Sequence, residues 1–391
     1  MHMVEPRPAH VNSAQSVGRT CHPSKEWYRA SLGHQRQKGL CMMRHTAVLI
    51  PGDGIGPEVA EATCLVMAEA GAQIDWETHH AGLGAVERGA TETLPAATIE
   101  AVQRCRVALK GPCTTPVGEG FTSVNVALRK RLDLFGAVRP VRSLDGVHTR
   151  YSDPGVDLVV VRENTEGLYS GIENVITQGV VTSLKVVTEK ASRRIATFAF
   201  EYAVARGRKK VTVLHKANIM KLGDGLFLRC CREVAEDYAG QVDYDEVIID
   251  AGSMRIVQRP EQFDVLLCEN LYGDVMSDLC AGLVGGLGCT PGANFGGDQC
   301  AVFEAVHGSA PDIAGQGVAN PLALIMSSVM MLRHMADSTC DAHCVDVADR
   351  IRDGYNAALV AGCQTRDLGG DLGTMEFARA VVEHLPALAG E

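Results

Sequence analysis

The chain has 391 residues, of which 46% are hydrophobic and 21% are charged, and its formal net charge is -10. A chain of this length favours two domains or a two-lobed enzyme, and its composition is that of a globular protein. The negative charge argues against a nucleic-acid partner, because a phosphate backbone requires a basic surface. The longest apolar run, residues 321–332, is too short to span a bilayer, so a membrane partner is not expected either.

The fourteen cysteines are scattered without regular spacing, which favours reduced thiols over a disulfide framework. Cys340, His343 and Cys344 have a spacing that resembles a metal-ligand motif. No second pair of ligands accompanies them, so the sequence favours two cysteines on one face of a helix over a zinc site.

Residues 1–43 are rich in His, Arg, Gln and Ser and lack hydrophobic periodicity, so they are predicted to be a disordered N-terminal extension. Its arginines suit an organellar transit peptide, but two glutamates and the lack of an amphipathic helix weaken that interpretation. A translation start at Met42 or Met43 is a third alternative. A cytoplasmic location is predicted, with the mitochondrial matrix as the alternative if the extension is a transit peptide.

The first predicted unit is a strand at residues 45–50, followed by a glycine-rich loop at 51–57 and a helix. Gly52, Gly54 and Gly56 are two residues apart, whereas the dinucleotide-binding turn of a Rossmann fold needs the spacing G-x-G-x-x-G. The sequence therefore predicts a tight loop at the C-terminal end of a strand, where open α/β sheets bind ligands, but not a Rossmann fold.

An alternation of strands and helices continues after this loop. Strands are predicted at residues 73–78 and 107–110, with a helix at 95–104 between them, and this order indicates an α/β sheet. Thr114 follows the second of these strands and could donate to a ligand, although threonines in turns are more often structural.

The next predicted helix and strand carry four arginines in a chain that is otherwise acidic. If Ser123 caps a helix, Asn125 and Arg129 share one face of it and can converge on a small anion. A strand that ends at Pro140 would deliver Arg139 to the same place. Guanidinium groups bind carboxylates bidentately, so the cluster predicts a substrate with several carboxylates. The alternative is a basic helix that faces water.

A β-branched run at residues 157–161 is typical of a strand that is buried on both faces, and Arg162 and Tyr169 follow its end. Residues 179–187 are rich in strand-forming side chains and predict a hairpin, one that could pair with another subunit. A helix is predicted at residues 189–205.

Three further strands, at residues 210–215, 245–249 and 263–267, each end in polar side chains. Those side chains are Lys216 and Asn218 after the first, Asp250 after the second, and the segment 269–274 after the third. Asp274 and Asp278 lie four residues apart on one helix face, and with Asp250 they offer oxygen donors for Mg²⁺ or Mn²⁺. The alternative is helix caps or solvated surface carboxylates.

A short strand at residues 301–304 precedes His307-Gly-Ser-Ala-Pro-Asp312, and a long apolar helix follows Asn320. Small residues in this segment permit the backbone to approach a flat ligand closely.

Six separated motifs resemble those of the β-decarboxylating dehydrogenases, the family of isocitrate and isopropylmalate dehydrogenases, and most of all the NAD-dependent isocitrate dehydrogenases. The resemblance covers residues 47–385. The motifs are Gly52-Asp-Gly-Ile-Gly-Pro57, Ser123-Val-Asn-Val-Ala-Leu-Arg129, Arg162-Glu-Asn-Thr-Glu-Gly167, Lys216-Ala-Asn218, Asn270-Leu-Tyr-Gly-Asp274 with Asp278, and His307-Gly-Ser-Ala-Pro311.

The resemblance implies a role for each matching residue. Tyr169 and Lys216 would be the acid/base pair of an oxidative decarboxylation of isocitrate to 2-oxoglutarate. The substrate would be bound by Ser123, Asn125, Arg129, Arg139, Arg162 and Asn218. A divalent cation, Mg²⁺ or Mn²⁺, would be held by Asp250, Asp274 and Asp278. The cofactor NAD would be bound by Thr114, His307, Gly308, Ser309, Ala310, Asp312, Ile313 and Asn320.

The implied fold has a large α/β domain (residues 44–134 and 285–391) and a small one (135–284) with a clasp segment at about 167–188 between subunits. Lys216, Asn218 and Asp250 would come from the second subunit of a homodimer or a higher homo-oligomer, so a monomer would be inactive. Asp312 and Ile313 replace the lysine and tyrosine typical of NADP-using relatives, which favours NAD.

Two observations leave alternatives open. Glu269 precedes Asn270 where many isocitrate enzymes have proline and isopropylmalate enzymes have glutamate, so homoisocitrate and 3-isopropylmalate are alternative substrates. Some family members are regulatory subunits that have lost site residues. This chain keeps the Arg, Tyr and Asp set, which favours a catalytic subunit.

Overall fold

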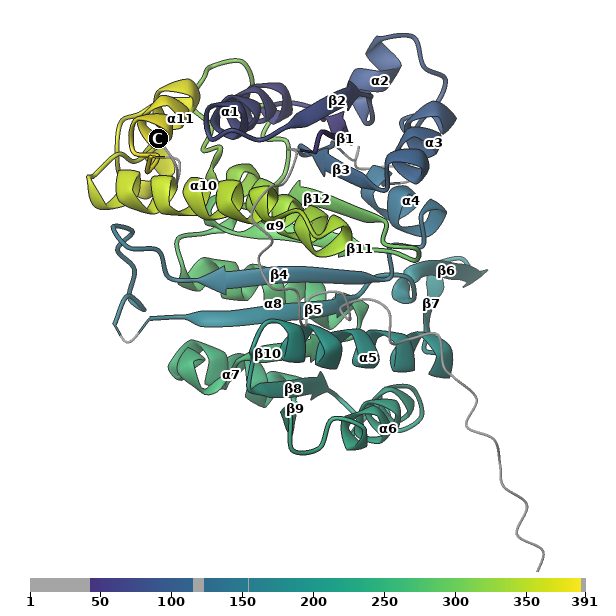
Figure 1. The fold of residues 1–391 in the computed structure, drawn as a ribbon. Coiled ribbons are helices and arrows are strands. Elements are labelled where there is room, and N and C mark those ends of the chain that lie inside the picture. Colours follow the sequence, from purple (N-terminus) through teal and green to yellow (C-terminus); the bar gives the residue numbers. More distant parts are fainter. Residues whose placement is uncertain (1–42, 115–122, 154, 388–391) are drawn as a thin grey trace, which may run out of the picture.

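The computed structural model describes residues 43–114, 123–153 and 155–387. These residues form a ten-stranded mixed sheet with helices on both faces and a separate two-stranded hairpin (Figure 1). The predicted α/β class is confirmed.

In chain order the helices and strands are β1 (His45–Ile50), α1 (Gly56–Glu69), β2 (Ile74–Thr78), α2 (Leu83–Glu87), α3 (Ala96–Cys105), β3 (Val107–Lys110), α4 (Val124–Arg131), β4 (Gly136–Arg142), β5 (Asp157–Glu163), β6 (Gly167–Thr177), β7 (Val180–Val186), α5 (Glu189–Ala205), β8 (Lys210–His215), α6 (Gly223–Glu236), β9 (Asp243–Ile248), α7 (Ile249–Gln258), β10 (Val265–Cys268), α8 (Asn270–Leu283), β11 (Pro291–Phe295), β12 (Ala301–Ala305), α9 (Leu322–Thr339), α10 (Ala342–Val360) and α11 (Thr374–Glu383).

The strands follow the order β2-β1-β3-β12-β11-β4-β5-β10-β8-β9 across the sheet. Most neighbours are parallel, as the predicted alternation of strands and helices requires. The antiparallel pairs are β11 with β12, β11 with β4, and β4 with β5. The direction of the strands therefore reverses in the middle of the sheet, between two parallel halves.

The two faces of the sheet are packed differently. One face is covered by a single continuous core, to which α1, α5, α6, α9, α10 and α11 contribute. The other face carries two separate cores. One lies between α3, α4 and the strands β1 and β3, and the other between α7, α8 and the strands β5 and β10.

Charged side chains occupy this second face between its two cores. Alternate residues of a strand point to the same side, so Lys110 shares its face with Ala108 of the first core, and Arg162 shares its face with Val160 of the second. The same alternation places Arg139 of β4 on this face. On this face the side chains of the central strands thus change from apolar to charged in the space between the two cores.

Several predicted elements have the bounds that the sequence indicated. The strands at residues 45–50, 107–110 and 210–215 and the helix at 189–205 are confirmed residue for residue. The strand expected to end at Pro140 instead runs on to Arg142. Proline is tolerated there because β11 pairs only with residues 136–138 of β4, so beyond them β4 has hydrogen-bonded neighbours on one side only.

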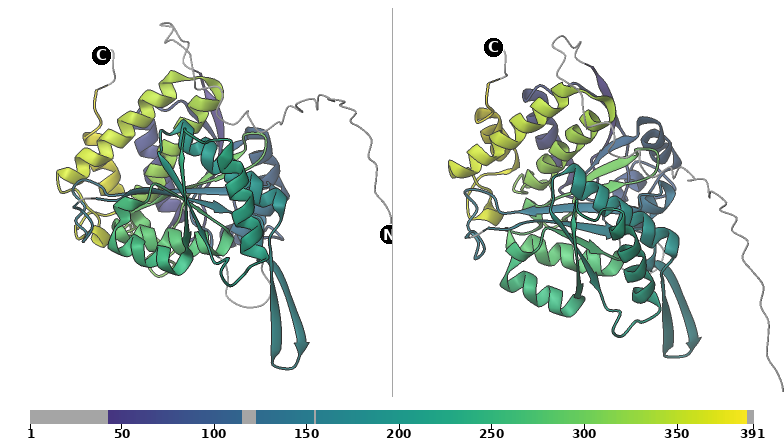
Figure 2. Two further views of the ribbon diagram at one scale, coloured as in Figure 1. Left: turned by 90° about the horizontal axis from the view of Figure 1, so that it is seen from below. Right: turned by 60° about the horizontal axis from the view of Figure 1, so that its bottom comes forward.

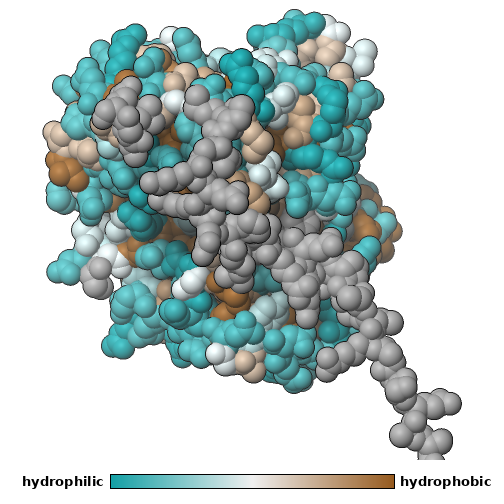
Figure 3. All heavy atoms as spheres, viewed as in Figure 1, coloured by the Kyte–Doolittle hydropathy of each residue, from teal (hydrophilic) through white to brown (hydrophobic). Residues whose placement is uncertain are grey.

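The predicted hairpin is present as β6 and β7, which pair antiparallel and project from the body of the molecule (Figure 2). Its outer part is apolar although exposed, with Ile172, Val175, Ile176, Val181 and Leu184 all facing solvent in the single chain. The visible surface in Figure 3 is otherwise mostly hydrophilic, with small hydrophobic patches.

The metal-ligand motif predicted to place two cysteines on one helix face is arranged differently. Cys340 ends α9 in a left-handed conformation and is exposed, whereas Cys344 is buried in the first turn of α10. The twelve cysteines of the described ranges are free thiols. No helix among the described residues is long and apolar enough to span a membrane. The N-terminal extension, apart from Met43, lies outside the described residues.

Candidate active site

Three arginines from different elements lie buried on the second face of the sheet. Arg129 comes from α4, Arg139 from β4 and Arg162 from β5, and each is less than 10% exposed. Burial, together with the charges of the other two arginines, lowers the pKa of Arg162 to about 10, so the guanidinium stays charged at neutral pH. This burial does not fit a basic helix that faces water. Arg131 and Arg142 of the same segment are exposed.

Two carboxylates of α8 border the arginines. Arg162 forms an ion pair with Asp274, and Nη1 of Arg139 lies 3.3 Å from Oδ1 of Asp278. Burial alone would raise the pKa of Asp274, but Arg162 and its other partners bring it below its usual range. The Asp278 side chain is 55% exposed, so an added ligand could reach it.

Tyr169 of β6 completes this group. Its hydroxyl donates to Oδ2 of Asp274 at 2.6 Å, and the Arg162 guanidinium lies 5.0 Å from the centre of its ring. Burial, and then the hydrogen bond to Asp274, raise the pKa of Tyr169, so the phenol keeps its proton at neutral pH. A protonated phenol beside buried cations can hand a proton to an anionic substrate.

A buried charge network supports Arg129 from the neighbouring strands. Glu304 of β12 lies 2.8 Å from Nζ of Lys110, accepts from Asn294 at 2.7 Å, and lies 3.5 Å from Arg129. Burial alone would raise the pKa of Glu304, but Lys110 and Arg129 lower it to about 2. Sequence reasoning missed Glu304, although a glutamate in the apolar strand Ala-Val-Phe-Glu-Ala was a signal.

Ser123 and Asn125 lie where the sequence placed them, at the N-terminal end of α4. Ser123 occupies the N-cap position, and Asn125 follows in the first turn. The Asn125 side-chain oxygen is buried and has no hydrogen-bond partner among the described residues. This oxygen is available to accept a hydrogen bond from a ligand, because an unpaired buried polar atom costs free energy.

Lys216 and Asp250 form a separate pair. Nζ of Lys216 lies 2.6 Å from Oδ1 of Asp250, which lowers the pKa of that carboxyl. Asp250 is in the first turn of α7, one residue beyond the predicted strand end, and its side chain is 68% exposed. Among the described residues it does not form a metal-ligand group with Asp274 and Asp278, so one chain by itself does not assemble the three acids. Asn218 lies in the loop after Lys216.

A second buried network holds the backbone at Lys216. Asp224 of α6 accepts the Lys216 amide N–H at 2.7 Å and the Nζ of Lys185 at 2.5 Å. Lys185, from β7 of the hairpin, also lies 2.9 Å from Glu269 and 4.8 Å from the ring centre of Tyr272. The hairpin, the loop at Lys216 and the start of α8 are thus joined through one lysine. This network was also missed, because its members are far apart in the sequence.

The glycine-rich loop after β1 packs closely against two other backbone segments, one at Pro112 and one at Ser309. A Cβ on Gly52 would lie 2.0 Å from the Pro112 carbonyl oxygen, and one on Gly54 would lie 2.0 Å from that of Ser309. Both glycines also have positive φ angles, which other residues rarely adopt. The Ser309 hydroxyl in turn lies 2.6 Å from that of Thr114. The loop therefore brings two of the predicted cofactor residues together.

A cavity of about 580 Å³ opens beside this loop. Five predicted cofactor residues contribute to its lining, namely His307, Gly308, Ala310, Ile313 and Asn320. Ile55, Gly288, Arg366 and Asp367 also line it and were not predicted. Nε2 of His307 is buried without a partner in the described part of the chain, and burial lowers the pKa of this histidine. Asp312 is exposed on the adjoining turn, and its carbonyl accepts from Gln316.

Comparison with known proteins gives a consistent assignment. The model of the isocitrate/isopropylmalate dehydrogenase family matches residues 46–381. The chain belongs to this family. It is a β-decarboxylating dehydrogenase by descent, and the recognition made from its motifs is confirmed.

Relatives within the family have different activities in their names. The mitochondrial isocitrate dehydrogenase (NAD) catalytic subunit 5 of Arabidopsis thaliana is 51% identical over 341 residues, which cover 87% of this chain and 88% of that protein. The chloroplastic 3-isopropylmalate dehydrogenase of Solanum tuberosum is 52% identical over 316 residues, 81% of this chain and 85% of that one. A mitochondrial regulatory subunit of isocitrate dehydrogenase (NAD) from Dictyostelium discoideum is 48% identical, with coverages of 86% and 91%.

Among solved structures, the isocitrate dehydrogenase of Methylococcus capsulatus superposes with a TM-score of 0.81 at 48% identity. The match covers 87% of this chain and 99% of that one. The mixed α/β fold of the family is therefore shared along nearly the whole of the described chain.

Proposed function

We propose that this protein is the catalytic subunit of an NAD-dependent isocitrate dehydrogenase, which oxidises and decarboxylates isocitrate to 2-oxoglutarate and CO₂. The observation that carries the proposal is the convergence of three buried guanidinium groups beside Tyr169 and two carboxylates of α8. Such a site matches a substrate with several carboxylates. The test is NADH formation by the purified protein with isocitrate, NAD and Mg²⁺, and its loss when a chelator removes the metal.

Asp274 and Asp278 fit a hard divalent cation, Mg²⁺ or Mn²⁺, because they offer only oxygen ligands and remain partly exposed. When bound, such a cation would polarise the substrate hydroxyl and carbonyl oxygens as a Lewis acid. Arg129, Arg139 and Arg162 hold the substrate carboxylates, and Lys216, together with the neighbouring carboxylate of Asp250, helps to remove the hydroxyl proton. Tyr169 donates a proton to the carbon that has lost CO₂.

NAD fits the cavity beside the glycine-rich loop, which offers apolar walls and the unpartnered ring nitrogen of His307. Bound there, it would accept the hydride of the oxidation. The exposed carboxylate of Asp312 can accept hydrogen bonds from ribose hydroxyls and would repel a 2′-phosphate, so NAD is favoured over NADP. Ile313 forms an apolar neighbour on the same turn.

We further propose that the active site is shared between two subunits of a homodimer or a higher homo-oligomer. The large domain would comprise residues 44–134 and 285–391 and the small domain 135–284, with the apolar hairpin as the clasp at about 167–188. The partner would then supply Lys216, Asn218 and Asp250. The separation of Asp250 from Asp274 and Asp278 within one chain supports this arrangement.

Subunit complementation tests the shared site. Arg139→Leu and Lys216→Met variants are each expected to be inactive alone. Co-expressed, they would form mixed dimers in which one site carries both substitutions and the other carries neither, so activity would return. No recovery in a verified mixed dimer would contradict the shared site.

Isocitrate is favoured over 3-isopropylmalate by the polar start of α4, whereas homoisocitrate, which also has three carboxylates, is the alternative substrate. The Ser123 hydroxyl and the side-chain N–H groups of Asn125 can donate hydrogen bonds to a third carboxylate, whereas an isopropyl group needs an apolar pocket. Asn125→Leu is expected to lower kcat/KM for isocitrate and raise it for 3-isopropylmalate. An increase for isocitrate would contradict the assignment.

A regulatory role is the alternative in a different class, since one relative of 48% identity is named as a regulatory subunit. Retention of the Arg, Tyr and Asp residues argues against it. A purified homo-oligomer without activity at saturating isocitrate, NAD and Mg²⁺ would favour the regulatory role.

For the location we favour the mitochondrial matrix over the cytoplasm that the sequence first suggested, because relatives of about 50% identity are named as mitochondrial. Residues 1–42, where a transit peptide would lie, are outside the described residues. Fusing residues 1–43 to a fluorescent reporter tests the proposal, and a reporter that stays in the cytoplasm would contradict it.

A further inference from the structure

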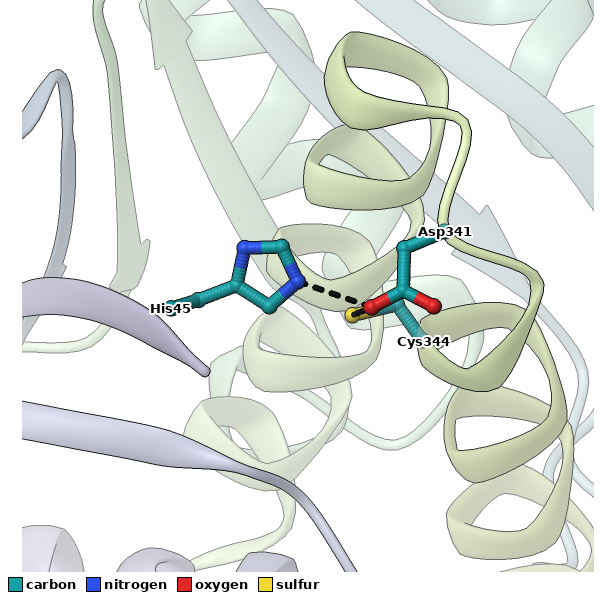
Figure 4. A group of neighbouring side chains, drawn as sticks. All are labelled: His45, Asp341 and Cys344. Atoms are coloured by element: carbon teal, nitrogen blue, oxygen red, sulfur yellow. Dashed lines mark hydrogen bonds and ion pairs between the residues drawn. The ribbon is translucent and has the colours of Figure 1, made fainter. Parts of the chain in front are cut away.

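Three side chains of metal-ligating type meet away from the active site, where the start of β1 packs against the junction of α9 and α10 (Figure 4). They are His45 of β1, Asp341 at the N-cap of α10, and Cys344 in its first turn. One ligand atom from each lies within 4.8 Å of the others. This is the only such group of three among the described residues.

The geometry centres on one carboxylate oxygen. Oδ2 of Asp341 lies 2.8 Å from Nε2 of His45 and 3.6 Å from Sγ of Cys344. The other oxygen, Oδ1, accepts the backbone N–H of His343 and so caps α10. The Asp341 side chain is 2% exposed and that of His45 is 11% exposed, so the group is buried but not sealed from water.

Hydrogen bonding alone accounts for only part of this arrangement. Asp341 as a helix cap with a histidine partner is a satisfactory structural contact, and the buried Cys344 also packs as a small apolar side chain of the continuous core. A thiol is a weak hydrogen-bond donor, so Cys344 gains little from its position beside the carboxylate. As a thiolate ligand it would gain far more, because sulfur and imidazole nitrogen are the donors that Zn²⁺ prefers.

We propose that His45, Asp341 and Cys344 bind one zinc ion, with water as the fourth ligand on the side where His45 is open to solvent. Binding replaces the thiol proton of Cys344, which leaves to solvent, and it also replaces the proton that Nε2 of His45 donates to Asp341, so the ring proton of the bound imidazole moves to Nδ1. The thiolate, the carboxylate and Zn²⁺ together then carry no net charge. Ligands held about 2.0–2.3 Å from a tetrahedral zinc ion lie about 3.3–3.7 Å apart, and Oδ2 of Asp341 lies 2.8 Å and 3.6 Å from the other two ligand atoms, so His45 must move away from Asp341 by a few tenths of an ångström.

This zinc site is separate from the proposed Mg²⁺ or Mn²⁺ site. His45 shares its strand face with Ala47, on the side of the continuous core, whereas Arg162 points to the opposite face of the sheet. Five strand spacings separate β1 from β5, which is about 24 Å at 4.8 Å each. The ion would thus act structurally, by fastening β1 to the α9–α10 junction, and would take no part in the reaction.

Cobalt substitution in the full-length protein tests the proposal. Metal-free protein is titrated with Co²⁺ while excess Mg²⁺ occupies the oxygen-only active site. We expect one equivalent of Co²⁺ per chain to give a thiolate-to-cobalt absorption band in the near ultraviolet, and Zn²⁺ to abolish that band. Zn²⁺ alone should also raise the unfolding temperature of the metal-free protein.

Matched variants identify the ligand. Cys344→Ser is expected to lose the band, whereas Cys340→Ser, at the exposed cysteine four residues away, is expected to keep it. His45→Gln provides a second variant with the thiol intact, and it should lose the tetrahedral spectrum and the thermal stabilisation by Zn²⁺. A wild-type protein without the thiolate band, or a band that survives in Cys344→Ser, would overturn the proposal and leave a hydrogen-bonded contact only.

Discussion

The two faces of the central sheet show how one fold separates stability from chemistry. One face is a single uninterrupted apolar core under six helices, whereas the other has two cores with a charged gap between them. The gap lies on the strands where their direction reverses, and it holds Lys110, Glu304, Arg139 and Arg162. Substitutions in the gap should therefore impair catalysis, whereas substitutions of exposed side chains on the same strands should not.

The largest effect is expected at the buried arginines of the gap. Arg139→Leu removes a guanidinium from the substrate and leaves Asp278 without its partner, so kcat/KM should fall by about 100-fold or more. Arg142→Leu on the same strand is the matched control, since Arg142 is exposed, and it should have little effect. Equal losses in both variants would contradict the division between gap and surface.

Glu304 tests whether the gap also contributes to stability. Its folded pKa of about 2 is below its ordinary value of 4.5, so its contribution is fully present above about pH 4.5 and is lost as the pH falls toward 2. Glu304→Gln should lower the free energy of unfolding by about 3 kcal/mol at neutral pH. Urea unfolding between pH 4 and 8 should show a difference from wild type that begins to shrink only at the acidic end.

The control for Glu304 is Glu92→Gln, which neutralises the exposed partner of Arg131 and should cost less than about 1 kcal/mol. A Glu304 variant with wild-type stability at neutral pH would show that the buried ion pairs of the gap only offset their own desolvation.

Asp224 lies outside the charged gap and tests the residues that are proposed to act in the active site of the partner subunit. Asp224→Asn weakens the support of the Lys216 backbone and of Lys185, so kcat should fall by up to about 100-fold with KM little changed. Asp237→Asn, at the exposed end of the same helix, is the control. If both kcat and KM stay at their wild-type values, the network does not position Lys216.

A smaller effect is expected at the rim of the cofactor cavity. Asp312→Lys together with Ile313→Tyr should lower kcat/KM for NAD and raise it for NADP, by a charge-pair contribution of about 1–3 kcal/mol. Steady-state kinetics with both cofactors measures the change. A wild-type preference for NADP would refute the assignment of Asp312.

The sequence predicted the elements and residues that have local signatures. The β-branched run of β5 and the helix at residues 189–205 carry periodic patterns, and the arginines of α4 and β4 are conspicuous in an acidic chain. Pro140 misled the prediction, because whether a strand tolerates proline depends on which neighbour lies beside it.

What was missed depends on contacts between distant segments. Lys110 pairs with Glu304 across 194 positions of sequence, and His45 meets Asp341 across 296. No local pattern predicts such pairs, because the sheet order that brings β3 beside β12 emerges only from the complete fold. Family resemblance predicted that Asp250 acts in the active site of a second subunit. No pattern in the sequence indicates this, and in a single chain it stays a proposal.

The most direct test of the account is a comparison of three substrates by the purified wild-type homo-oligomer. NADH formation is measured with isocitrate, homoisocitrate and 3-isopropylmalate at saturating NAD and Mg²⁺. We expect a higher kcat/KM with isocitrate than with 3-isopropylmalate, because the polar start of α4 can bind a third carboxylate, which 3-isopropylmalate lacks. Faster turnover of 3-isopropylmalate, or no turnover of any of the three acids, would contradict it.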